Sequence, residues 1–111
     1  MRRVLAALVM LGVATAAAAA LAADPPEIAL TIEKNRFQPD EIKVKAGVPF
    51  VLVVTNKDAG PEEFESKELR IEKVIPPGKT VRIRVRALKP GAYGFIGEYH
   101  EKTAKGRIVA D

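Results

Sequence analysis

The only histidine in the chain, His100, lies in a stretch whose residue types could bind a metal ion. Glu98 and Glu101 flank it, and Gly97 breaks the strand-like segment that precedes it. A neutral imidazole is the commonest metal ligand among side chains and titrates near neutral pH. Loops held between rigid strands are also where all-β proteins often carry function. These residues alone fit a surface histidine in an ordinary hairpin loop equally well.

A second acidic segment, residues 58–68, adds carboxylates to the possible ligands. They are Asp58, Glu62, Glu63, Glu65 and Glu68. One histidine with several carboxylates is an oxygen-rich set, which suits ferrous or ferric iron, manganese or cupric copper better than cuprous copper. The alternative is a plain soluble surface, in which Glu68 and Glu72 pair with neighbouring lysine and arginine side chains.

The elements that must position these side chains are short, alternating and rich in β-branched residues. Turn residues such as Pro76-Pro77-Gly78 and Pro90-Gly91 separate them, and no useful helical period follows residue 23. We predict roughly seven or eight strands in an all-β, antiparallel Greek-key β-sandwich. The expected strands include 28–32, 42–45, 50–54, 63–65, 70–75, 81–86, 92–95 and 106–110.

Two of these strands have distinct patterns. The apolar run 50–54 predicts a strand covered on both faces. Residues 81–86 alternate, which predicts valine and isoleucine inside and Arg82, Arg84 and Arg86 in solvent.

The N-terminus reads as an export signal rather than as part of this domain. Arg2 and Arg3 precede an apolar, alanine-rich run that ends at Ala20-Leu21-Ala22, as in a secretory signal peptide. We therefore predict a signal peptide at 1–22, one domain at 23–111 of about 89 residues, and a periplasmic location. An uncleaved membrane anchor is the alternative, because the run nearly spans a bilayer.

Composition narrows the chemistry further. The chain has no cysteine, so neither a disulfide nor a thiolate ligand is available, although an exported compartment would permit disulfides. The formal charge of +4 falls by two, to +2, if Arg2 and Arg3 leave with the signal. We predict no nucleic-acid partner, because such binding needs a concentrated basic face.

Several motifs, in order and spacing, resemble the cupredoxins from about residue 27 to the end. The resemblance implies a cupredoxin-like sandwich whose two ligand-bearing loops meet at one end. The motifs are Phe37-x-Pro39, Ile42-x-Val44-x-Ala46-Gly47, the apolar strand ending at Asn56, Pro77-Gly78, Leu88-x-Pro90-Gly91-x-Tyr93-x-Phe95 and Lys105-Gly106-x-Ile108-Val109.

The resemblance also shows that the blue-copper ligands are mostly missing. A type 1 site needs two imidazoles, a thiolate and a weak axial ligand such as methionine. The first imidazole, commonly within Pro-His-x-Phe, falls in Pro61-Glu62-Glu63-Phe64, and the thiolate falls near Gly97. The second imidazole falls on His100, and the axial methionine falls near Thr103-Ala104.

The acidic motifs Glu63-Phe64-Glu65-Ser66, Glu72-Lys73-Val74 and Gly97-Glu98-Tyr99-His100-Glu101-Lys102 closely resemble one group of cupredoxins, the small periplasmic proteins that accompany bacterial oxidase-dependent ferrous iron permeases. That resemblance implies binding of iron or copper, not as type 1 copper, and help with ferrous iron oxidation or delivery. The implied partner is an inner-membrane iron permease or a periplasmic iron-binding protein. Whether the chain is an enzyme, and its oligomeric state, stay open.

The same resemblance places the first metal-facing side chain at Glu63, and Glu98 and His100 follow. Glu62 and Glu65 are further candidate ligands, since strand alternation lets only some of these carboxylates face inward. The competing hypothesis is a metal-free periplasmic β-sandwich that docks a membrane partner through its arginine face.

Overall fold

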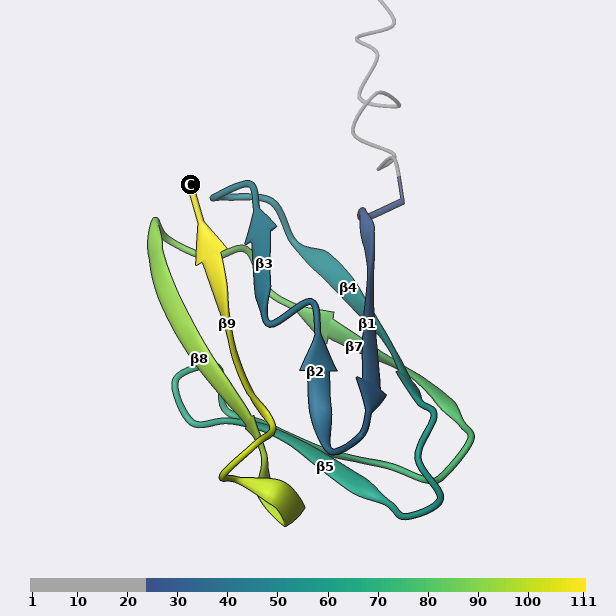
Figure 1. Ribbon diagram of the computed structural model, residues 1–111. Coiled ribbons are helices and arrows are strands. Elements are labelled where there is room, and N and C mark those ends of the chain that lie inside the picture. Colours follow the sequence, from purple (N-terminus) through teal and green to yellow (C-terminus); the bar gives the residue numbers. More distant parts are fainter. Residues whose placement is uncertain (1–23) are drawn as a thin grey trace, which may run out of the picture.

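The computed structural model describes residues 24–111, so the predicted signal peptide lies outside the described residues. These residues form two sheets packed face to face, which confirms the predicted all-β sandwich (Figure 1). The four-stranded sheet has the order β2 (Arg36–Gln38), β1 (Glu27–Glu33), β4 (Phe50–Asn56) and β7 (Thr80–Val85). The five-stranded sheet has the order β3 (Glu41–Val44), β9 (Lys105–Ala110), β8 (Gly91–Gly97), β5 (Glu62–Ser66) and β6 (Ile71–Ile75).

Each sheet contains one parallel pair among antiparallel neighbours. β1 runs parallel to β4, and β3 runs parallel to β9. The sheets are therefore mixed, a refinement of the antiparallel arrangement predicted from sequence. Alternation reports which face of a strand is buried but carries no information about the direction of its neighbours.

The two strands with distinct patterns differ in how closely they follow the prediction. In β4, Phe50, Leu52 and Val54 are buried against the other sheet, whereas on the opposite face Val51 is buried and Val53 is only half-buried, so the second face is covered in part. In β7, Ile83 and Val85 are buried while Arg82 and Arg84 are exposed, as predicted.

An aromatic cluster joins the two sheets close to the predicted site. Phe37 of β2 meets Phe95 of β8 edge to face at a centroid distance of 5.0 Å, and Phe95 stacks on Phe64 of β5, also at 5.0 Å. Gly106 of β9 permits this packing, since a Cβ there would lie only 2.3 Å from Cζ of Phe95. The buried rings fix β5 against β8, and with it the side chains at the near ends of these strands.

The segment after β8 is shaped differently from the plain loop expected. Residues Glu98–His100 form one turn of 3-10 helix, η2, directly after Gly97. The chain then turns back, with the amide of Ala104 donating to the carbonyl oxygen of His100 at 2.8 Å. None of the described helices is long and apolar enough to cross a membrane.

Candidate metal centre

Strand β5 divides the predicted ligands between two faces of the five-stranded sheet. Glu62, Phe64 and Ser66 are buried, whereas Glu63 and Glu65 are only partly covered and lie on the outer face. Successive side chains of a strand point to opposite faces. Glu62 and Glu63 therefore cannot belong to the same side of the sheet.

The inner carboxylate, Glu62, is 1% exposed and fully hydrogen bonded. Its Oε1 accepts from the backbone amides of Glu63 and Tyr99, both at 3.0 Å. Its Oε2 lies 2.6 Å from Nδ1 of His100. Since a buried carboxylate is costly without such partners, these contacts explain how an acidic side chain can occupy the interior here.

Gly97 and Ala104 complete the wall around this carboxylate. A Cβ at Gly97 would lie 2.6 Å from Cδ of Glu62 and 2.7 Å from Cβ of Ala104, closer than real Cβ contacts allow. The amide of Gly97 also donates to the carbonyl of Ala104 at 2.9 Å. The Glu62 carboxylate thus takes up space that any larger residue at position 97 would need.

The positions that the resemblance assigns to the copper ligands therefore converge, but their side chains do not form a type 1 site. No thiolate is present, because the chain has no cysteine. Glu62 and His100 contact one another directly at 2.6 Å. An ion at about 2.0 Å from each of them would force these two atoms further apart. The inner pair as it stands is a direct hydrogen bond that leaves no room for a metal ion between the two atoms.

On the outer face, three carboxylates gather across β5 and β6. Glu63, Glu65 and Glu72 can each place one oxygen so that all three lie within 4.8 Å of one another. The pairing of Glu65 with Glu72 across the two strands brings them together. Oxygen ligands at this spacing suit a hard or borderline cation, and we call Glu63, Glu65 and Glu72 the outer carboxylates.

Helix η2 borders the outer carboxylates and responds to their charge. A hydrogen bond to Glu63, with the negative charges of Glu63, Glu65 and Glu72, raises the pKa of Glu98 to about 7. Loss of hydration, together with the charge of Glu63, raises the pKa of the exposed Tyr99 hydroxyl. Crowded carboxylates raise a neighbour's pKa because a further negative charge beside them is unfavourable.

The structure therefore splits the five candidate ligands into two groups. Glu62 and His100 form the inner pair, while Glu63, Glu65 and Glu98 lie together outside. The register inferred for β5 was wrong by one residue, because Glu62 and not Glu63 faces inward. The strand begins at Glu62 rather than at Glu63.

Glu72 is the member of the outer group that the sequence interpretation missed. It was expected to pair with a nearby basic side chain, yet among residues 24–111 no ion pair involves it. Its position opposite Glu65 depends on the β5–β6 turn. The signal in the sequence was the pair of short strands predicted at 63–65 and 70–75 with a tight turn between them, because such a hairpin places residues of the same face side by side.

Comparison with known proteins identifies the family and the fold of this chain. A family described as the cupredoxin-like domain matches residues 3–110. An uncharacterized protein of Rickettsia prowazekii (strain Madrid E) is 35% identical over 85 residues, which cover 77% of this chain and 68% of that protein.

Solved structures show the same fold at lower identity. Auracyanin A, a "blue" copper protein of Chloroflexus aurantiacus, superposes with a TM-score of 0.67 at 16% identity, covering 78% of this chain and 99% of that one. The metal-binding domain of the Streptococcus pneumoniae Cu(I)-exporting ATPase CopA gives 0.65 at 21% identity, covering 77% and 84%. At these identities the likeness is one of fold.

The inner pair makes a direct prediction about stability. Glu62→Ala leaves two amides and His100 without their acceptor and opens a cavity. We expect it to lower the free energy of unfolding by about 3 kcal/mol, the low end for breaking a buried pair, because His100 is partly exposed. Glu65→Ala, on the outer face of the same strand, should stay within about 0.5 kcal/mol. Equal losses in urea denaturation would contradict the assigned role of Glu62.

The raised pKa of Glu98 predicts a pH dependence of stability. Between pH 4.5, the ordinary value, and about 7, the folded state keeps a proton that the unfolded state has lost. Stability contributed by Glu98 is therefore present at low pH and is lost as the pH rises through this window. In metal-free buffer, Glu98→Gln should flatten this decline, and salt should weaken the difference, because the group is exposed. If the stability of the wild type and of Glu98→Gln fell with the same slope against pH, the carboxylates around Glu98 would not be raising its pKa.

Proposed function

This chain belongs to the cupredoxin-like domain family, and we propose that it is a periplasmic metal-binding protein without a type 1 site. The observation that carries the proposal is the set of outer carboxylates, whose oxygens can approach one another within 4.8 Å. The proposed ion is iron or copper, bound by Glu63 and Glu65 together with Glu72, with Glu98 beside them.

The chemistry of the donors supports a cation of this class. Three carboxylates provide negative charge and oxygen ligands, which favour ferrous or ferric iron and cupric copper over cuprous copper. A bound cation would also relieve the repulsion that raises the pKa of Glu98. In this proposal Glu62 and His100 hold η2 in place beside the ion and do not bind it.

We further propose that the protein assists ferrous iron oxidation or delivers iron to an inner-membrane permease or a periplasmic iron-binding protein. Support for this step comes from the acidic motifs that resemble the iron-uptake cupredoxins and from the export-like N-terminus. The outer carboxylates are partly exposed, so an ion held there would be accessible to a second protein.

A second candidate is a metal-free interaction module, and one observation favours it. The Glu62 carboxylate fills the space between Gly97 and His100, so the sandwich is complete without an ion. In this case the exposed Arg82, Arg84 and Arg86 would provide the docking face.

Calorimetric titration with Cu²⁺, Mn²⁺ and, without oxygen, Fe²⁺ separates the two candidates. We expect one ion to bind the wild type, and Glu63→Gln/Glu65→Gln to weaken binding by more than the ~10–100-fold typical of losing a supporting group. The control variant Glu33→Gln/Asp40→Asn removes as much charge elsewhere and should bind normally.

Three results would count against the proposal. No binding to the wild type would favour the metal-free module. Unchanged binding by Glu63→Gln/Glu65→Gln would remove the outer carboxylates from the site. Loss of binding in His100→Ala alone, with folding confirmed by circular dichroism, would return the ion to the inner pair.

A further inference from the structure

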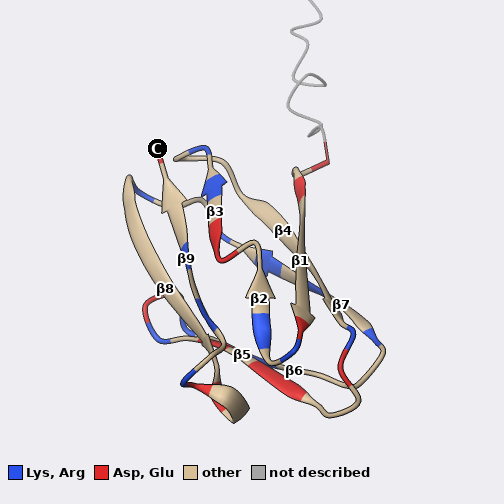
Figure 2. Cartoon of the chain, viewed as in Figure 1, with Lys and Arg blue, Asp and Glu red and all other residues tan. Residues whose placement is uncertain are grey.

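The outer face of the five-stranded sheet carries opposite charges on its two flanks. Strand register pairs Glu72 with Glu65, Glu65 with Ile96, and Ile96 with Lys105. Directly paired residues share a face, so these four side chains form one row across β6, β5, β8 and β9. The row runs from acidic through apolar to basic. Figure 2 shows acidic residues on β5 and β6 and basic residues on β9.

A second row beside the first repeats the same order of charge. Gly94 of β8 pairs with Arg107 of β9. On the other side, a Cβ built at Gly94 would lie 4.0 Å from Oε1 of Glu68. The second row is therefore Glu68, Gly94 and Arg107, again acidic, small and basic.

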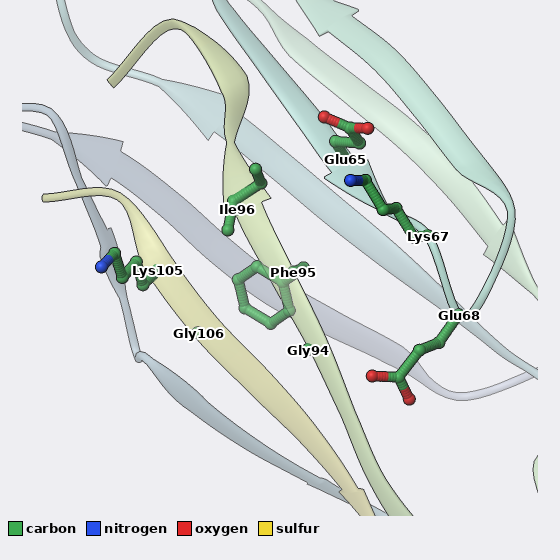
Figure 3. A pocket seen from close by; sticks show the side chains of 8 residues that line it. All are labelled: Glu65, Lys67, Glu68, Gly94, Phe95, Ile96, Lys105 and Gly106. Carbon is green, nitrogen blue, oxygen red and sulfur yellow. The ribbon is translucent and has the colours of Figure 1, made fainter. Parts of the chain in front are cut away.

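A hollow of about 440 Å³ separates the two charged flanks. Its floor includes Gly94, Phe95 and Ile96, and it exists because Gly94 has no side chain to fill it. Figure 3 shows Glu65 and Glu68 together with Lys67 on the β5 side of the hollow, and Lys105 on the β9 side.

We propose that this face binds a second copy of the chain, about a two-fold axis that lies in the interface parallel to β8. Such an axis exchanges the two flanks, as an isologous interface requires. Lys105 of each copy then faces Glu65 of the other, and Arg107 faces Glu68. Ile96 meets its own equivalent over the hollow.

The charges on the isolated chain leave these groups available for a partner. Among the described residues, the ion pairs are Arg82–Glu27, Arg107–Glu41 and His100–Glu62, so none involves Glu65, Glu68 or Lys105. The Arg107–Glu41 pair is exposed, and exposed pairs contribute little. A second copy would bring Lys105 beside Glu65, whose carboxylate oxygen lies close to those of Glu63 and Glu72.

The size of the face indicates a weak, reversible dimer. Five strands at the usual spacing and about five residues along each give a footprint of about 19 Å by 17 Å. This is small for a stable interface, which buries about 800 Å² per partner. Because charge pairs carry the contact, association should weaken as ionic strength rises.

Charge-reversal variants of residues 23–111, studied by sedimentation equilibrium, test the proposed dimer. The basic-flank variant, Lys105→Glu/Arg107→Glu, and the acidic-flank variant, Glu65→Lys/Glu68→Lys, each place like charges opposite one another. Each alone should associate at least tenfold more weakly than the wild type at low salt. Mixed in equal amounts, the two variants should form a heterodimer, because every facing pair is then complementary.

A control variant, Lys79→Glu/Arg84→Glu, makes the same charge change away from this face and should dimerise normally. A wild type that stays monomeric at high concentration and low salt would overturn the proposal. So would a dimer that both reversals leave intact, or mixed variants that fail to associate although circular dichroism shows both are folded.

The dimer and the proposed metal site can fail independently. Glu65 takes part in both, but the basic-flank variant keeps Glu63, Glu65 and Glu72 unchanged. If that variant loses dimerisation and still binds metal, both proposals stand. If the wild type dimerises and binds no metal, only the proposed function falls.

Discussion

The 2.6 Å contact between Glu62 Oε2 and His100 Nδ1 is the constraint on which this end of the sandwich depends. It joins the first residue of β5 to the end of η2, two segments far apart in the chain. A carboxylate can lie 1% exposed only if its charge is compensated. The two backbone amides that donate to Glu62, from Glu63 and Tyr99, fix the start of β5 and the turn of η2 together.

This contact also accounts for the residues around it. Gly97 must lack a side chain, because a Cβ would overlap the Glu62 carboxyl group. Glu62, Gly97 and His100 are therefore mutually dependent, and exchanging one of them for a copper ligand would disturb the others. The hydrogen bond between Glu62 and His100 lies where the resemblance to cupredoxins puts type 1 copper ligands. In the proposed function, metal binding has moved through the sheet to the outer carboxylates.

The sequence predicted the sandwich well because its strands alternate clearly. The arginines of β7 and the apolar run of β4 lie where their patterns put them. Chain order and motif spacing also pointed to residues 61–64, Gly97, His100 and residues 103–104 as one site. The structure brings Glu62, Gly97, His100 and Ala104 together there. The sequence did not predict which neighbouring strands run parallel. The parallel β1–β4 and β3–β9 pairs arise because the chain crosses from one sheet to the other between these strands.

The division of the candidate ligands was harder to predict for a physical reason. In a run such as Glu62-Glu63, either glutamate could face inward, and a one-residue shift exchanges the two faces. Both side chains are charged and would be expected in solvent, so the sequence pattern does not show which of the two glutamates faces inward. The choice depends on His100 and Gly97, which lie more than thirty residues away in sequence and become neighbours only in the fold.

Anomalous X-ray diffraction from crystals loaded with copper or iron tests most directly whether the site has moved. We predict a metal peak beside Glu63, Glu65 and Glu72, with the contact between Glu62 and His100 unbroken. A peak between Glu62 and His100, with the two side chains moved apart to bind the ion, would contradict a metal site at the outer carboxylates.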